Sequence, residues 1–136
     1  MSQIDLVERI RDEIVKTYRI LETEIVENDK EKYRKRLMEH EELEEKVAKK
    51  LNELFEKLRK EGIEIVPEEP NCNTPVSGMG FETVYCVDYF MVKVDDRKYE
   101  IAVEWYRHWT TPPASINYKF SWGIRGSWIN EVEEND

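Results

Sequence analysis

Two polar side chains, His40 and Glu44, stand on an otherwise apolar stripe of a predicted helix and are the first candidates for chemistry. An imidazole one helical turn from a carboxylate is suited to binding a metal ion or to acid–base catalysis. A third metal ligand is missing nearby, because the only other histidine, His108, belongs to a predicted sheet. We therefore favour a buried register lock, in which Tyr18, His40 and Glu44 form a hydrogen-bond network between two packed helices. The stripe consists of Tyr33, Leu37, His40, Glu44, Val47, Leu51, Leu54 and Leu58.

A second candidate is a pair of carboxylates, Asp88 and Glu104, on neighbouring predicted strands. Their order resembles the Asp…Glu-x-Lys arrangement of restriction-nuclease-like enzymes, which serves a metal ion. Here position 106 is a tyrosine instead of the lysine. The simplest hairpin register pairs Val94 with Tyr99, which sends the two carboxylates to opposite faces of the sheet. We therefore predict no catalytic residue, no metal site and no cofactor.

Aromatic residues are concentrated in the second half of the chain. Such residues fill sheet cores, anchor protein interfaces or stack on nucleic-acid bases. Few cations accompany them, which argues against base stacking. A sheet core is our first interpretation, and a protein-binding surface is the second. The candidate interface residues are Trp105, Tyr106, Arg107, Trp109, Trp122 and Trp128.

The helices that must position the first candidates follow from apolar periodicity. Residues 2–27 and residues 30–61 each carry an apolar stripe at helical spacing. Asn28 and Asp29 interrupt both stripes and are typical of turns and helix starts. We therefore predict an antiparallel helical hairpin over residues 1–61, and the alternative is one long helix used for dimerisation.

The remaining chain predicts an antiparallel sheet. Residues 62–81 form a connecting segment, with a short strand at 63–66 and then a long loop rich in Pro, Gly and Asn. Alternating apolar and polar residues predict three strands, at 83–94, 99–106 and 116–124. The fold class is thus α+β: one domain over residues 1–136, in which the helical hairpin precedes a three- to four-stranded antiparallel β-meander over residues 82–129. An acidic tail follows at 130–136.

The net charge of −9 is concentrated in the second half of the chain. Residues 1–61 hold 17 acidic and 15 basic residues, whereas residues 62–136 hold 13 and 6. This balance argues against direct nucleic-acid binding, which needs clustered cations, and suits a protein partner with a basic surface. The five cations between positions 30 and 36 do not change this conclusion, because five glutamates between positions 39 and 45 screen them.

Composition also predicts the compartment. No apolar run reaches membrane-spanning length and residues 1–5 lack a signal pattern, so we expect a cytoplasmic protein without membrane contact. The Lys- and Glu-rich composition resembles that of thermophile proteins. For such a protein we expect Cys72 and Cys86 to be two ordinary thiols, although a disulfide between them is an alternative.

No catalytic site converges in these patterns, which predicts a non-enzymatic protein-interaction protein. Its sharper form is a regulator or inhibitor that places an acidic face on a basic surface of a nucleic-acid-handling partner. One alternative is a structural protein that assembles through its helices, for example as a homodimer. A second alternative is a metal-dependent nuclease or hydrolase.

Overall fold

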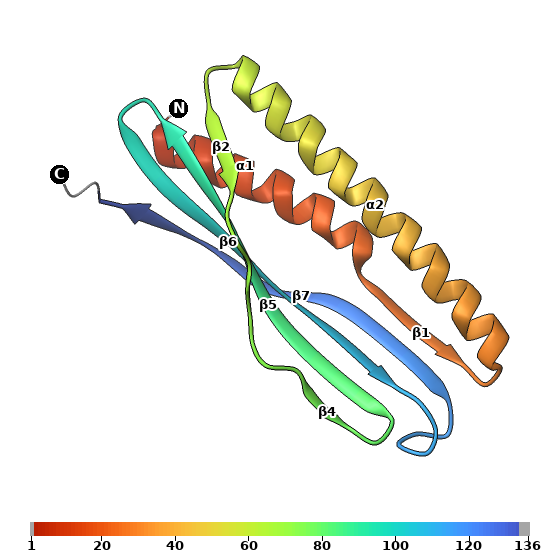
Figure 1. Ribbon diagram of the computed structural model, residues 1–136. Coiled ribbons are helices and arrows are strands. Elements are labelled where there is room, and N and C mark those ends of the chain that lie inside the picture. The colour runs from red at the N-terminus through yellow and green to blue at the C-terminus, as the bar shows by residue number, and fades with distance from the viewer. Residues whose placement is uncertain (1, 134–136) are drawn as a thin grey trace.

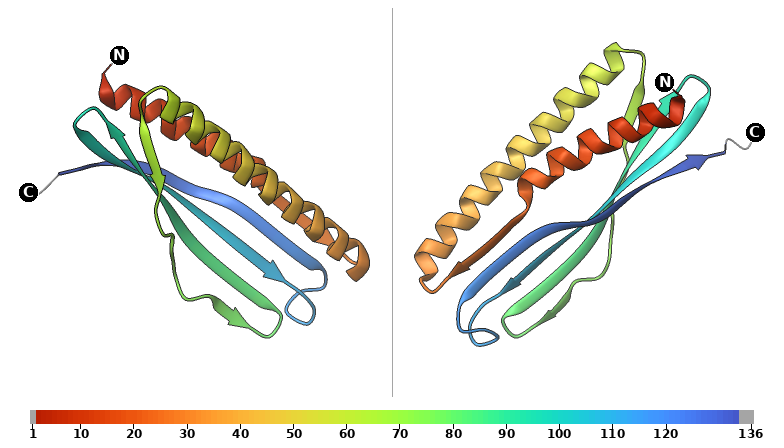
Figure 2. Two further views of the ribbon diagram at one scale, coloured as in Figure 1. Left: turned by 45° about the horizontal axis from the view of Figure 1, so that its top comes forward. Right: turned by 180° about the vertical axis from the view of Figure 1, so that it is seen from behind.

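Two helices lie side by side over one face of a curved antiparallel sheet in the computed structural model, which describes residues 2–133 (Figures 1 and 2). Seven strands form the sheet in the order β1-β7-β6-β5-β2, and β3 and β4 also pair with β5. The predicted α+β class is confirmed, whereas the sheet has more strands than the predicted three to four. The elements are α1 (Gln3–Tyr18), the 3-10 helix η1 (Arg19–Leu21), β1 (Thr23–Glu27), α2 (Lys30–Lys60), β2 (Glu64–Pro67), β3 (Asn71–Cys72), β4 (Val76–Gly78), β5 (Phe81–Val94), β6 (Arg97–Thr110) and β7 (Tyr118–Val132).

The first helix is shorter than predicted. α1 ends at Tyr18, and the next residues form η1 and then β1, which pairs with β7 at the edge of the sheet. The predicted helix over residues 2–27 is therefore wrong in its last third. The cause lies in the spacing of Leu21 and Ile25, which are both buried. Residues four apart share one face of a helix and also one face of a strand, so this spacing cannot distinguish the two.

The second helix begins and ends close to the predicted residues. The Asp29 carboxylate caps its start by accepting hydrogen bonds from the N–H groups of Glu31 and Lys32. Gly62, with φ of 87°, follows its last turn in a conformation that favours glycine. α2 runs back alongside α1 (Figure 1). The predicted helical hairpin is nevertheless not confirmed, because β1 lies between the two helices in the chain.

The three long strands β5, β6 and β7 are consecutive and pair antiparallel, as predicted. Val94 pairs with Arg97 instead of the predicted Tyr99, because the turn between β5 and β6 has only two residues. The register is thus shifted by two positions. Such a shift keeps every side chain on its predicted face, so Asp88 and Glu104 still lie on opposite faces.

The irregular segments contain more strand than predicted. The short strand predicted at 63–66 corresponds to β2, but the loop predicted after it contains β3 and β4. β7 continues to Val132, so the start of the predicted acidic tail belongs to the sheet, and residues 134–136 lie outside the described residues. In each case the pairing partner is distant in sequence, and local composition does not reveal its hydrogen bonds.

The core lies between the helices and the sheet face that they cover, which we call the helix face; we call the other face the outer face. Both predicted helix stripes point into this core. Neither helix, within the described residues, combines the length and apolarity that crossing a bilayer requires. The core includes Val7, Ile10, Ile14 and Tyr18 of α1, Val47, Phe55 and Leu58 of α2, and Val92, Ile101, Val103, Phe120 and Trp122 of the sheet.

Candidate functional site

A cleft of about 360 Å³ lies between the first half of α2 and the ends of β6 and β7. Both polar residues of the helix stripe line it, together with a cation and several aromatic side chains. Its volume is in the range of small-molecule sites. The lining residues are Tyr33, Leu37, His40, Glu41, Glu44, Arg107, Trp109, Thr111 and Phe120.

His40 is a buried polar residue of the cleft, with 6% of its surface exposed. Its Nε2 lies 3.0 Å from the Leu21 carbonyl oxygen, and its Nδ1 lies 3.4 Å from Glu44 Oε1. The ring also packs edge-on against Phe120, at 5.1 Å between centroids. Since a carbonyl oxygen only accepts hydrogen bonds, Nε2 carries the proton that it donates to Leu21. His40 therefore ties α2 to η1 and to β7 at the base of the cleft.

Arg107 supplies the positive charge of the cleft. It follows the alternation of β6 onto the helix face, where Val84 and Trp122 are its cross-strand neighbours. The side chain is half-buried. Among residues 2–133, none forms a hydrogen bond, an ion pair or a cation–π contact with it. Its guanidinium donors thus have no acceptor among the described residues, and none of its nitrogen atoms is fully buried.

Much of the wall of the cleft is aromatic. Trp109 and Phe120 are cross-strand neighbours on β6 and β7. Tyr33 packs against Tyr118 at 5.3 Å between ring centroids, and its hydroxyl donates to the Lys119 carbonyl oxygen at 3.3 Å. Burial raises the pKa of Tyr33 above its usual value, so its ring presents a neutral phenol.

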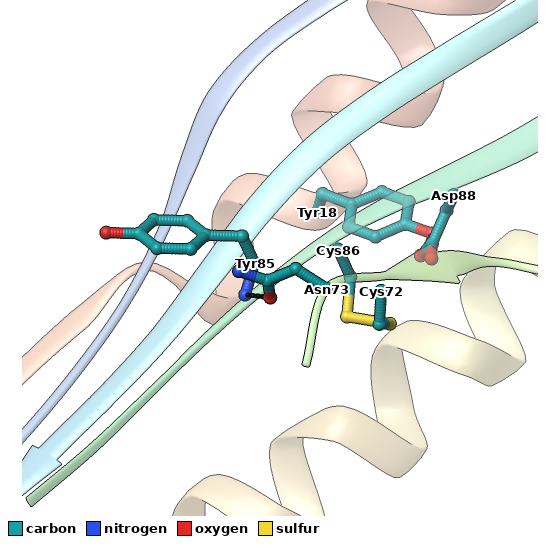
Figure 3. The surroundings of a disulfide bond; sticks show 6 residues. All are labelled: Tyr18, Cys72, Asn73, Tyr85, Cys86 and Asp88. Atoms are coloured by element: carbon teal, nitrogen blue, oxygen red, sulfur yellow. Dashed lines mark hydrogen bonds between the residues drawn. A yellow bond between two sulfur atoms is a disulfide. The ribbon is translucent and has the colours of Figure 1, made fainter. Parts of the chain in front are cut away.

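The predicted register lock is only partly assembled. His40 and Glu44 lie next to each other, but the Tyr18 hydroxyl donates to Asp88 Oδ2 of β5 at 2.5 Å (Figure 3). The Tyr18 ring stacks on Trp122 and meets Phe90 edge-on. Burial, and then the negative charge of Asp88, raises the pKa of Tyr18 far above its usual value. Tyr18 thus fastens the end of α1 to β5.

The six candidate interface residues do not form one surface. Trp105, Arg107, Trp109 and Trp122 lie on the helix face, whereas their strand neighbours Tyr106 and Trp128 lie on the outer face. Trp122 is 4% exposed and stacks on Trp105 at 5.5 Å, so both rings belong to the packing between layers.

The outer face carries its own aromatic group around Tyr106 and Trp128. Trp128 is 37% exposed. Arg125 lies 4.8 Å above the Tyr85 ring and 3.4 Å from Glu104 Oε1, so its charge is paired. Glu104 is thereby committed to Arg125, on the face opposite Asp88. No group of three or more His, Cys, Asp or Glu side chains within residues 2–133 is arranged to hold a metal ion.

Cys72 and Cys86 are joined by a disulfide, so the prediction of two ordinary thiols is wrong (Figure 3). The two residues are direct cross-strand partners of β3 and β5. They are separated by 14 positions in the chain, and only the pairing of the two strands brings them together. The sequence alone did not predict β3, and therefore did not predict this contact.

Sequence reasoning also missed the role of Arg107 as an unpaired cation. The signal was present in β6, where Trp105, Arg107 and Trp109 alternate on one face and place a charge among aromatic residues. Tyr33, Leu37 and Phe120 were predicted as packing residues and not as the walls of a cleft.

Comparisons of the chain with protein-family models, with curated proteins and with solved structures found no match. We therefore infer its function from the geometry of the cleft.

Proposed function

We propose that this protein binds a small organic anion with an apolar body in the cleft between α2 and the ends of β6 and β7. The observation that carries the proposal is Arg107, a half-buried residue whose guanidinium has no protein partner in the described part of the chain. A carboxylate or sulfonate would accept two parallel hydrogen bonds from the planar guanidinium of Arg107. Binding would thus compensate a charge that the fold leaves unpaired.

The walls of the cleft select the rest of the ligand. Leu37, Trp109 and Phe120 offer apolar and aromatic surface on two sides. Burying one aromatic ring of a ligand against them contributes more than the single ion pair, because apolar burial scales with area. A cleft of about 360 Å³ suits a ligand with one ring or a short branched chain.

The acidic rim limits the charge of the ligand. Glu41 and Glu44 stand on the α2 side of the cleft, and the chain as a whole carries a net charge of −9. A polyanion would be repelled by both, whereas one negative charge can be neutralised by Arg107. The favoured ligand class is therefore a monoanion. We propose binding of this ligand and assign no catalytic role to a residue of the cleft.

Calorimetric titration with 3-phenylpropionate tests the proposal, with the neutral 3-phenylpropanamide as the ligand control. Arg107→Gln is expected to weaken binding of the carboxylate about tenfold to a hundredfold, since a charge-assisted hydrogen bond contributes about 1.5–3 kcal/mol. Arg125→Gln is the matched protein control, because Arg125 is paired on the outer face. Equal affinity of wild type and Arg107→Gln, or an equal loss in both variants, would contradict the proposal.

A protein-binding role on the outer face is a second candidate function, favoured by the exposure of Trp128 beside the other aromatic side chains of that face. It retains part of the predicted interface. Chemical cross-linking of the protein in a cell extract would test this role. The measurement compares the number of partner cross-links at Lys119 on β7 with the number at Lys49 on α2. Partner cross-links concentrated at Lys119 are expected, whereas cross-links mainly at Lys49 would favour assembly through the helices. The role of an acidic regulator of a nucleic-acid-handling partner stays a prediction.

A further inference from the structure

Residues 68–80, which we call the strap, lie along one edge of β5. The strap contains β3 and β4, and both pair with the first half of β5. Figure 1 shows β4 beside β5. Every residue from 71 to 79 is exposed, including Val76 at 57% and Met79 at 81%. No apolar side chain of the strap between residues 71 and 79 is buried, although such burial is what normally holds a segment in place.

Besides the pairing of β3 and β4 with β5, a small set of polar contacts and one covalent bond hold the strap. The backbone N–H of Asn73 donates to the Tyr85 carbonyl at 3.0 Å, and the Tyr85 N–H donates to the Asn73 side chain at 2.9 Å. The Glu68 N–H donates to the Tyr89 carbonyl at 2.8 Å. The disulfide joins Cys72 of the strap to Cys86 of β5 beside these bonds. Hydrogen bonds at an exposed edge compete with water, so the disulfide is the main restraint.

The strap covers an edge that has little other protection. Residues 81–87 of β5, FETVYCV, are rich in residues that favour strands and include one charged residue, Glu82. Proteins usually protect a free strand edge with charge, proline, a bulge or a covering segment. The β1 edge has charge, in Glu24 and Glu27, whereas β5 relies on the strap.

We propose that reduction of the Cys72–Cys86 disulfide releases the strap and lets the uncovered β5 edge pair with the same edge of a second copy. An external dithiol supplies the two electrons and two protons. Its thiolate attacks the sulfur of the exposed Cys72, Cys86 leaves as a thiolate that takes up a proton, and the second thiol of the reductant then frees Cys72 and closes the reductant's own disulfide. Cys86 is 2% exposed and is shielded from direct attack.

A second copy fits this edge for two reasons. The strap segments pair antiparallel with β5, and an edge related to itself by a twofold axis also pairs antiparallel. The uncovered segment carries a single charge, so repulsion between copies is small there, in contrast to the acidic β1 edge. The proposal is independent of ligand binding in the cleft.

Sedimentation velocity of the oxidised and the dithiothreitol-reduced protein, at several micromolar concentrations, tests the pairing. The oxidised protein is expected to be a monomer and the reduced protein a dimer. Cys72→Ser, without reductant, is expected to behave as the reduced protein. Val87→Lys places a charge on the edge and is expected to keep the reduced protein monomeric, because a lysine on an edge strand opposes pairing with a second edge.

Hydrogen exchange followed by mass spectrometry separates release of the strap from pairing of the edge. Reduction is expected to accelerate exchange in residues 71–79 at least about tenfold, while residues 82–87 regain protection as the concentration rises. Circular dichroism checks that each variant stays folded. A reduced protein whose strap stays protected would overturn the release. A reduced, folded protein that stays monomeric, or that aggregates equally with Val87→Lys, would overturn the pairing.

Discussion

The hydrogen bond from Tyr18 to Asp88 is expected to be one of the strongest single polar contributions to the stability of this protein. It joins the last residue of α1 to the middle of β5, across 70 positions of the chain. The donor ring is 7% exposed, and the acceptor is a carboxylate at 2.5 Å. Tyr18→Phe removes only the hydroxyl and leaves the ring contacts with Phe90 and Trp122. It therefore isolates the hydrogen bond.

The expected loss is about 2 kcal/mol at neutral pH, since hydrogen bonds to charged groups contribute about 1.5–3 kcal/mol and a stranded acceptor adds desolvation cost. For 136 residues the entropy of unfolding is about 0.29 kcal/mol/K, so this loss lowers the melting temperature by about 7 °C. Tyr33→Phe is the control, because its hydroxyl makes a longer bond, at 3.3 Å to a neutral carbonyl, and its expected loss is about 1 kcal/mol or less.

The pH dependence gives a second signature of the same bond. Because folding raises the pKa of Tyr18, the folded protein holds the phenol proton more tightly than the unfolded chain does. This contribution is fully present below the unfolded pKa of about 10 and is lost as the pH rises above it, by about 1.4 kcal/mol per pH unit. Phenylalanine does not titrate. The difference between wild type and Tyr18→Phe should therefore shrink above about pH 10.

Urea unfolding at pH 7 and at several alkaline values, followed by circular dichroism, measures both effects. The titration of the other tyrosines is common to the two proteins and cancels in the difference. Equal urea midpoints at pH 7 would refute the value assigned to the bond. A difference that stays constant into the alkaline range would refute its coupling to the Tyr18 proton.

Two further substitutions test packing at the sheet and at the base of the cleft. A Cβ at Gly123 would lie 2.8 Å from the Tyr106 ring, so Gly123→Ala should lose about 1–3 kcal/mol by urea unfolding, whereas Gly126→Ala, which meets nothing within 4 Å, should change stability by less than about 0.5 kcal/mol. Similar losses in both variants would contradict the contact. His40→Leu should leave the protein folded but lower its free energy of unfolding by about 1–2 kcal/mol, because the Leu21 carbonyl loses its hydrogen-bond donor. A variant that is more stable than wild type in the same assay would show that this hydrogen bond makes no net contribution to stability.

Local periodicity predicted the helices correctly where the spacing of apolar residues fits a helix and does not fit a strand. The stripe from Tyr33 to Leu58 is a run of three- and four-residue steps over several turns, and a strand cannot reproduce it. The structure accordingly places it against the sheet. The end of the first helix was predicted wrongly, because the step from Leu21 to Ile25 fits a helix and a strand equally. Pairing with the free edge of β7 then favoured the strand.

The sequence singled out several residues of the candidate site but did not predict that they lie together. His40 and Glu44 were recognised as exceptions on their stripe, and Arg107 was grouped with the aromatic residues. Their meeting in one cleft depends on how α2 crosses the sheet, which no local pattern specifies. The partner of Tyr18 was misassigned for the same reason, since Asp88 is 70 positions away and comes within reach only when β5 enters the sheet.

The amino-acid sequence by itself determined the class of the fold, the inward stripes of the helices and the face on which each residue of β5 and β6 lies, because these depend on backbone periods of 3.6 and 2 residues. Tertiary structure alone decided that β1, β3 and β4 are strands, that Cys72 meets Cys86, and that Arg107 stands unpaired in a cleft. These features arise from contacts between segments far apart in the chain. Their free energy comes from a partner strand or a shared core, and a short window of sequence contains neither.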